Sequence, residues 1–523
     1  MTLLRKLVIA GMFASAAAPA AAETPVRGGT LVYAVNGDTS TYDCHGASSF
    51  SNIHYLAPHY SLLLRFDAVE YPKIVGDVAE SWTVSEDGKT YTFRLRDGVE
   101  FHDGSKLTSR DVKATYDRLR APPKDVVSVR QGLFADIEAI ETPDPATVVF
   151  RIGQPNAGML SNFASPWNCI YSAAKLQADQ RFPVHNIMGS GPFRFVEHVA
   201  GSHWVGKRFE NYYDRKLPHL DGFRAITMTN TAIVNAMAGG QIMAEFRGFA
   251  PAEVARVKSA RGDQVAFAEG GWLAHFFFSV NAEKKPFDDI RVRRALTLAV
   301  DRWGGAGPMS RITFLKTVGG LMRPGSAMAL GGDELTDLPG FGRDIAAARV
   351  EARRLLAEAG VPKLSFKLTN RVTSPFVPLG LFLIDQWRQI GVTAEHIQLE
   401  TGQWLTTRQA GNFEVCVDSQ AEWNDDPSVQ LARYLSFDKA ENNISRYVDR
   451  KADDLYARQQ AALDLKSRSA LVHELQRHLV AQAYSGPLYW AARNAPVDRR
   501  VQGWMSLPSH MLNQDLREIW LKQ

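Results

Sequence analysis

The most diagnostic stretch of the chain is residues 78–112, which read VAESWTVSEDGKTYTFRLRDGVEFHDGSKLTSRDV. Its first half predicts a β-hairpin, because two strand-forming runs flank Asp87-Gly88, and this dipeptide supplies the positive φ that a tight turn needs. Tyr91, Phe93 and Leu95 alternate with polar residues, which indicates that one face of the second strand is buried.

The rest of the chain predicts mixed α/β domains. A helix is expected after Thr108, where Asp111 stands at the position that completes the cap. Residues 348–361 and 379–392 each show the apolar spacing of an amphipathic helix, and the strand-forming run 363–370 lies between them. A chain of 523 residues is too long for one ordinary core, so we expect two or three domains.

The first residues are typical of a secretory signal peptide. Arg5 and Lys6 precede the apolar run 7–17, and small residues indicate cleavage near Ala22. No cysteine lies at the cleavage point, so we expect no lipid anchor. No later segment is continuously apolar over a membrane-spanning length. We therefore expect residues 1–22 to be removed and the mature protein to be periplasmic.

The charge and the cysteine content argue against a nucleic-acid-binding protein, a zinc protein and a disulfide-rich protein. A formal charge of +4 without a Lys/Arg-rich run indicates no nucleic-acid partner. Cys44, Cys169 and Cys416 fit no zinc motif, and three cysteines make no disulfide framework. We expect all three to be unpaired and structural, with a Cys44–Cys169 bridge as the alternative. The sequence predicts no metal and no cofactor.

Six blocks follow one another from about residue 28 to the C-terminus: GGTLVYAVNGDTSTYDCH, the block quoted above, GSGPFRFVEH, NYYDRKLPHLDGF, SVNAEKKPFDDIRVRRALTLAVDR and SGPLYWAAR. In content and order they resemble the extracytoplasmic solute-binding proteins of ABC importers, in the peptide/nickel (oligopeptide- and dipeptide-binding) family. The resemblance covers nearly the whole mature chain, and the hairpin block is its most diagnostic part.

The resemblance implies an α/β, two-lobed periplasmic binding protein fold with an extra inserted domain and a hinge that closes the lobes (a Venus flytrap). The expected domains are a discontinuous lobe I at 23–60, 180–267 and 489–523, an inserted domain II at 61–179, and a lobe III at 268–488. A ligand would lie between the lobes, and two crossing segments would form the hinge.

The family places part of its ligand site in the loop after the first strand. Here that loop reads TYDCHGASSFSN, and His45 matches the family histidine. Ligand-facing side chains come a few residues later in relatives, which points to Ser48, Ser49 and Phe50. The alternative is a solvated loop.

QAEWNDDPS, residues 420–428, is the second candidate region. Peptide-binding relatives carry an Asp four residues before the proline, where it pairs with the peptide ammonium. This chain has Trp423 there, flanked by Glu422 and Asn424, with Ser419 and Gln420 just upstream. A buried ammonium without a carboxylate is costly, so we expect the amine clamp to be lost and Trp423 to offer a flat wall for stacking. The alternative is a core tryptophan.

Four further residues have family counterparts near the pocket. Arg408 is a candidate partner for a ligand carboxylate, or else a surface arginine. The other candidates are the aromatic residues Trp404, Tyr489 and Trp490. We expect either Tyr489 or Trp490 to face the ligand. Asp425 and Asp426 are expected to form a capped turn, and Asp418 is either a pocket acceptor or the partner of an arginine.

The chain lacks Gly-x-Ser-x-Gly, His-Glu-x-x-His, P-loop and dinucleotide-binding motifs, so we predict no catalytic residue and no enzyme. We predict a monomeric binding protein that captures a small organic solute, namely a peptide-like compound, an opine or sugar derivative, or an aromatic or other carboxylate. It would deliver that solute to the transmembrane permease of an ABC importer. The alternatives are a sensory protein that presents its ligand to a membrane receptor and, more remotely, a secreted hydrolase.

Overall fold

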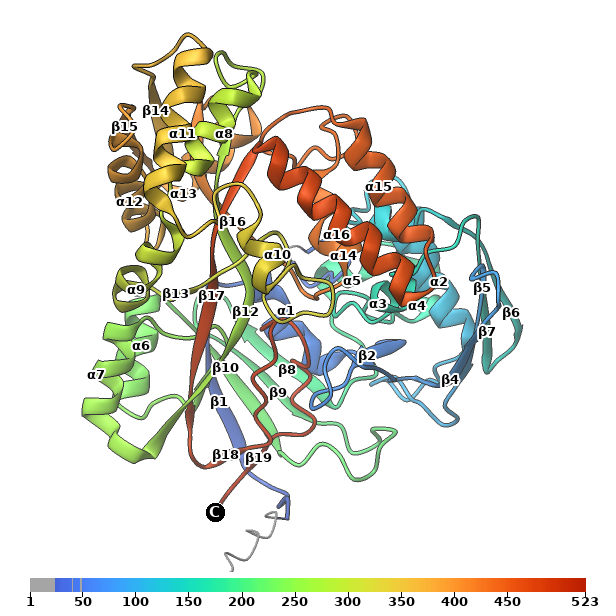
Figure 1. Cartoon of the computed structure of the whole chain (residues 1–523). Coiled ribbons are helices and arrows are strands. Elements are labelled where there is room, and N and C mark those ends of the chain that lie inside the picture. The colour runs from blue at the N-terminus through green and yellow to red at the C-terminus, as the bar shows by residue number, and fades with distance from the viewer. Residues whose placement is uncertain (1–23, 40, 48) are drawn as a thin grey trace, which may run out of the picture.

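The computed structural model describes residues 24–39, 41–47 and 49–523. The predicted signal peptide and Ser48 lie outside the described residues. The described chain is mixed α/β, as predicted, and its upper and lower parts in Figure 1 share one large sheet.

The central sheet of the described chain has the order β15-β14-β16-β12-β17-β11-β1-β10-β9-β8, and β13 pairs with β17 beside this path. Its strands are β1 (Thr30–Asn36), β8 (Phe193–Val199), β9 (His203–Arg208), β10 (Gly222–Met228), β11 (Ala244–Glu245), β12 (Val265–Val280), β13 (Leu315–Val318), β14 (Ser365–Arg371), β15 (Thr393–Leu399), β16 (Val415–Ala421) and β17 (Ser485–Asp498).

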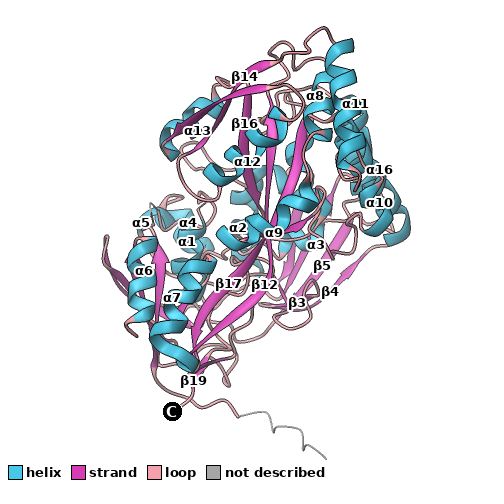
Figure 2. Ribbon diagram, turned by 60° about the vertical axis from the view of Figure 1, so that its left-hand side comes forward, coloured by secondary structure: helices cyan, strands magenta, loops and turns pink. Residues whose placement is uncertain are grey.

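Strands β12 and β17 connect the two parts of the molecule. They pair antiparallel along most of their length, and Figure 2 shows them side by side between the lower and upper parts. Their register shifts between Gly271 and His275, so the ladder is interrupted where the chain passes from one part to the other. The expected lobe boundaries at residues 268 and 489 both fall within these strands; the domain division itself stays a prediction.

Helices cover both parts of the sheet (Figure 1). The lower part carries α6 (Asn230–Ala238) and α7 (Pro251–Arg261). The upper part carries α8 (Ile290–Leu298), α9 (Arg302–Ile312), α11 (Ile345–Glu358), α12 (Phe376–Arg388), α13 (Thr401–Gln409), α15 (Arg450–Ala461) and α16 (Leu465–Gln482). Helices α11 and α12 flank β14 in sequence, as predicted, and each is followed by a glycine with positive φ, Gly360 and Gly391.

A smaller antiparallel sheet contains the diagnostic block, in the order β4-β5-β7-β6. Its strands are β4 (Ala79–Val84), β5 (Thr90–Leu95), β6 (Ile137–Asp144) and β7 (Thr147–Ile152), and α2 (Ser109–Arg120) packs on it. The predicted hairpin is confirmed: β4 pairs with β5, Gly88 has a φ of 68°, and Tyr91, Phe93 and Leu95 are buried. The predicted cap is present too, because the Thr108 N–H donates to the Asp111 carboxylate at 2.7 Å.

Shorter elements complete the described chain. The helices and turns are α1 (Phe50–Leu56), α3 (Met159–Phe163), α4 (Ala173–Ala178), α5 (Phe182–His185), α10 (Gly332–Thr336), α14 (Pro427–Gln430), η1 (Ala57–His59), η2 (Gln131–Phe134), η3 (Gly262–Gln264) and η4 (Ala432–Tyr434). The remaining strands are β2 (Leu64–Phe66), β3 (Ile74–Gly76), β18 (Val501–Gln502) and β19 (Trp520–Leu521).

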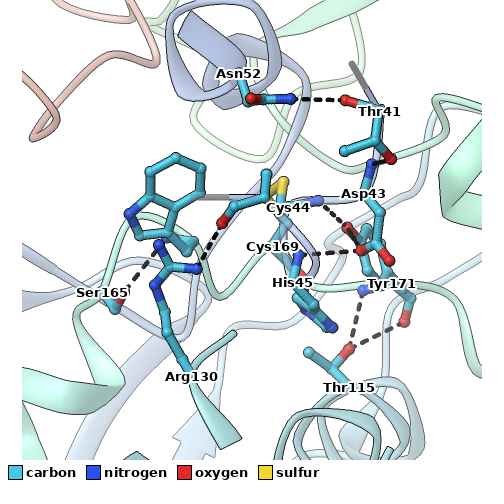
Figure 3. Close-up of a disulfide and its surroundings, with 12 residues drawn as sticks. Thr41, Asp43, Cys44, His45, Asn52, Thr115, Arg130, Ser165, Cys169 and Tyr171 are labelled. Atoms are coloured by element: carbon cyan, nitrogen blue, oxygen red, sulfur yellow. Dashed lines mark hydrogen bonds between the residues drawn. A yellow bond between two sulfur atoms is a disulfide. The ribbon is translucent and has the colours of Figure 1, made fainter. Parts of the chain in front are cut away.

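Cys44 and Cys169 form a disulfide, so the expectation of three unpaired cysteines is wrong (Figure 3). Their Cα atoms lie 6.1 Å apart although 125 residues separate them in sequence. The loop before α1 packs on the segment after α3, where the Cys44 N–H donates to the Tyr171 hydroxyl at 2.8 Å. Cys416 is free and buried, as expected.

Candidate functional site

The segment 422–428 of the upper part packs against the unit that carries the small sheet. The Trp423 side chain is 5% exposed, and its ring meets Phe66 edge-on at 6.1 Å between centroids. The Asp425 N–H donates to the Tyr71 hydroxyl at 2.9 Å. These contacts join residues more than 350 positions apart, so the segment lies at the surface where the two parts of the molecule meet.

The two aspartates of this segment are held by arginines and by the backbone. Asp425 accepts from Arg323 at 2.6 Å, and Asp426 accepts from Arg468 at 2.7 Å. Asp426 also caps α14 by accepting from the Ser428 N–H at 2.8 Å, which confirms the expected capped turn. With both carboxylates already engaged, nothing in their surroundings supports a hydrolytic acid pair.

Asp418 is the partner of two arginines rather than an unpaired acceptor. It is fully buried, and it accepts from Arg408 at 2.9 Å and from Arg371 at 2.6 Å. Arg408 is therefore already paired with a protein carboxylate. Its predicted contact with a ligand carboxylate stays a prediction, and this ion pair gives it no support.

The remaining aromatic candidates are deeply buried and have protein partners. Trp404 is fully buried in an apolar cluster with Phe277 and Phe413. The Trp490 ring stacks on His275, with 4.8 Å between ring centroids. The Tyr489 hydroxyl donates to the Arg302 carbonyl at 3.0 Å. Their role in ligand binding is untested, and this packing is what core residues show.

The polar candidates upstream of Trp423 hold the end of β16. Gln420 donates to the Gln430 carbonyl at 2.9 Å and to the Glu422 carboxylate at 3.0 Å. The half-buried Ser419 donates its N–H to Asp418. The Asn424 side-chain oxygen accepts from the Asp426 N–H, while its amide nitrogen is buried without a partner among the described residues.

His45 belongs to a buried network beside the disulfide (Figure 3). One ring nitrogen donates to the Cys169 carbonyl at 3.1 Å, and the other accepts from Arg118 at 2.9 Å. Arg118 also pairs with Asp43 at 2.6 Å. Burial lowers the pKa of His45 to about 3, so its imidazole is neutral at physiological pH. This is the environment of a structural histidine.

Phe50, by contrast, lies beside a basic side chain. Ser49 caps α1 by accepting from the Ser51 N–H, and Phe50 is the first residue of that helix. The Arg247 guanidinium lies over the Phe50 ring, 4.4 Å from its centroid, and the His510 ring is 5.4 Å from Phe50. Among the predicted loop residues that the structure describes, Phe50 lies beside Arg247, Ser49 caps α1, and His45 lies beside the disulfide.

Glu422 is the acid of this region. Burial raises the pKa of Glu422 to about 7, although its hydrogen bond from Gln420 and the charges of Arg433 and Arg130 lower it. Sequence reasoning named Glu422 but missed Arg130, Arg247 and Arg433. Each of these arginines stands alone in a segment without a motif, so no signal in the sequence marks them.

Among the described residues, no three metal-ligating side chains are grouped closely enough to hold a metal ion. No helix in the described part of the chain has both the length and the apolar character needed to cross a membrane.

Known proteins are similar to this chain over most of its length. Residues 73–442 match the family described as bacterial extracellular solute-binding proteins, family 5 middle. The dipeptide-binding protein of Escherichia coli (strain K12) is 26% identical over 520 residues, which cover 92% of this chain and 93% of that protein. The glutathione-binding protein GsiB of Salmonella typhimurium is 29% identical over 383 residues, covering 71% and 70%.

Two solved structures share the fold. The periplasmic binding protein DppA of Helicobacter pylori, in complex with the peptide STSA, gives a TM-score of 0.80 at 22% identity and covers 95% of this chain and 99% of its own. The binding protein AgaA of A. tumefaciens, in complex with agropinic acid, gives 0.78 at 23% identity, with 95% and 99% covered. The expected α/β, two-lobed periplasmic binding protein fold is confirmed.

Proposed function

The chain belongs to family 5 of the bacterial extracellular solute-binding proteins, and from this we propose that it captures a small organic solute between its lobes and delivers it to the permease of an ABC importer. It is a solute-binding protein by family. The finer statements, that it is a monomer, exported by cleavage near Ala22 and without catalytic activity, are part of this proposal.

One observation carries the proposal: the segment 422–428, which follows β16, contacts the unit that carries the small sheet through Trp423 and Asp425. Contacts of this kind exist only while the two lobes are together. A solute that touches both lobes stabilises that arrangement, and a membrane partner can then distinguish the loaded protein from the empty one.

The residue at position 423 is the basis for our choice of solute class. The names of the relatives cite dipeptides and glutathione, and one solved structure holds agropinic acid. This chain lacks the Asp that pairs with a peptide ammonium in peptide-binding relatives. We therefore favour a non-peptide, such as an opine or sugar derivative or an aromatic or other carboxylate, over a peptide.

A thermal-shift screen over peptides, opines, sugars and aromatic acids tests solute binding directly. A solute at 100 times its Kd adds about 2.7 kcal/mol to the free energy of unfolding, which is readily measured. We expect one class to raise the melting temperature without being consumed. A shift by no compound would contradict the proposal, and turnover of a hit would favour the hydrolase alternative. A neighbouring permease–ATPase operon would favour transport over the sensory alternative.

A further inference from the structure

Three arginines from three parts of the chain have few polar partners among the described residues. Arg247 follows β11, Arg130 precedes η2, and Arg433 lies in η4. Among the described residues none of the three forms an ion pair, whereas Arg408 and Arg371 share Asp418. Each of the three guanidiniums lies over an aromatic ring. The Arg247 guanidinium is 4.4 Å from the Phe50 ring centroid. The Arg130 guanidinium is 4.2 Å from the Trp167 ring centroid, and the Arg433 guanidinium is 5.1 Å from that of Phe277.

Two of these guanidiniums are also poorly solvated. Burial lowers the pKa of Arg247, and its Nε is buried without a partner. The charge of Glu245 acts on Arg247, but among the described residues the two form no ion pair, and Glu245 accepts from the Gly248 N–H at 2.6 Å. Burial lowers the pKa of Arg130 to about 9, and within the described part of the chain its guanidinium donates one hydrogen bond, to the Ala47 carbonyl at 2.9 Å. Both stay charged at neutral pH, and a buried charge without a counter-charge is costly.

Glu422 cannot balance this charge. It lies near enough to Arg130 and Arg433 for both to lower its pKa, but it forms an ion pair with neither. With a pKa of about 7 it carries on average about half a negative charge at neutral pH. Glu245 beside Arg247 is the second acid, and burial raises its pKa too. Three guanidiniums therefore face two carboxyl groups that burial makes harder to ionise, which leaves an excess of positive charge that an anion would neutralise.

Contacts along the chain link the segments that carry these charged groups to a wall of aromatic rings. The Phe50, His510 and Trp272 rings follow one another at 5.4 Å and 5.5 Å between centroids. The Glu422 N–H donates at 3.0 Å to the carbonyl of Leu273, the residue after Trp272. Arg130 reaches Ala47, three positions before Phe50. The loop before α1, the hinge strand β12 and the end of β16 therefore converge here.

Given the proposed function, on which this inference rests, we propose that the bound solute is an organic acid whose carboxylate is held by Arg247, Arg130 and Arg433, with its apolar or planar body against the Phe50–His510–Trp272 wall. Guanidinium groups bind carboxylates through paired, charge-assisted hydrogen bonds. The three arginines come from different parts of the chain, so one carboxylate would draw those parts together. The two acids beside these arginines, Glu245 and Glu422, both have their pKa raised by burial, which makes them poor partners for an ammonium group.

The test pairs each acid with a neutral or ammonium-bearing compound of similar shape: phenylacetate with phenylacetamide, galacturonate with galactose, and N-acetylated amino acids with amino-acid amides and dipeptides. Binding is measured by thermal shift and then by calorimetry at pH 8. We expect acids to bind and their partners to fail. Arg247→Gln or Arg433→Gln should weaken the best acid about ten- to hundredfold, because each removes a charge-assisted hydrogen bond.

Arg256→Gln is the matched control, since Arg256 is exposed on α7 in the same lobe as Arg247 and has no partner among the described residues. It should leave affinity unchanged. If peptides or neutral solutes bind while acids do not, solute binding stands and this inference falls. If an acid binds equally well to the wild-type protein and to both arginine variants, the inference falls too. If no compound of any charge binds, the proposed function itself fails.

Discussion

Glu422 shows how one residue links the acidity of the site to stability. Its carboxyl is hydrogen-bonded by Gln420 and faces Arg433 and Arg130, and its charge acts on the nearby Tyr434. Burial raises the pKa of Glu422 to about 7, which means that the folded protein prefers the protonated form. The stability that Glu422 contributes is thus fully present below its ordinary pKa and declines as pH rises through 7.

The substitution Glu422→Gln should remove the loss of stability that the wild-type protein suffers as pH rises through 7. The free energy of unfolding of the variant minus that of the wild-type protein should rise between pH 5 and pH 8, by no more than about 1.4 kcal/mol for each unit by which the pKa is raised. Urea unfolding at both pH values measures it. Taking the difference matters, because several buried histidines also titrate; burial lowers the pKa of His54 and of His275 to about 3. A difference that is flat with pH would contradict this account of Glu422.

Trp423 is 5% exposed within the apolar cluster of the small sheet, and its role in ligand binding stays a prediction. Its ring packs on Phe66 across the lobe boundary, so its contact energy belongs to the closed arrangement. Trp423→Ala should weaken solute binding at least about tenfold, which corresponds to 1.4 kcal/mol, and leave the melting temperature of the solute-free protein little changed. Calorimetry and thermal unfolding measure the two effects.

Trp404→Ala is the matched comparison, because Trp404 is fully buried within the upper part. Its truncation should cost about 3–5 kcal/mol of stability in the solute-free protein, as for other core aromatic residues. Loss of stability in Trp423→Ala with unchanged affinity would instead make Trp423 a core residue.

At the scale of elements, local patterns were predictable and contacts between distant segments were not. The hairpin β4–β5, the Thr108 cap and the glycine ends of α11 and α12 depend on residues a few positions apart, and the structure has all of them. The Asp418–Arg371 pair and the Cys44–Cys169 bond join segments far apart in sequence, so no local pattern encodes them. The three arginines of the proposed site were missed for the same reason.

The disulfide ties the loop before α1 to the segment after α3. A bridge closing a loop of roughly 100 residues stabilises a protein by up to about 4.7 kcal/mol through the unfolded state. Reduction, or a Cys44→Ala/Cys169→Ala double variant, should therefore lower the melting temperature clearly. Thiol counting in denaturant checks the bond itself: one thiol without reductant and three after reduction. Three thiols without reductant would show that the bond is absent.

For the whole molecule, the account requires two arrangements of the lobes about β12 and β17. In the structure the Leu463 side chain lies against Gly88 with no room for a Cβ between them, and the Ala157 N–H donates to the Gln460 carbonyl at 2.8 Å. With Trp423 and Asp425, these contacts describe lobes held together. Moving a mostly open population to a mostly closed one requires about 5.5 kcal/mol of preference for the closed form, which several buried contacts supply together.

Spin labels at Glu86→Cys and Lys466→Cys measure this closure most directly. Both positions are exposed, Glu86 on the β4–β5 hairpin and Lys466 on α16, near the Gly88–Leu463 contact, while Cys416 is buried. For protein stripped of solute, we expect a long or broad distance distribution that becomes short and narrow when the best acid of the screen saturates the site. A distribution that does not change while calorimetry shows saturation would contradict the account.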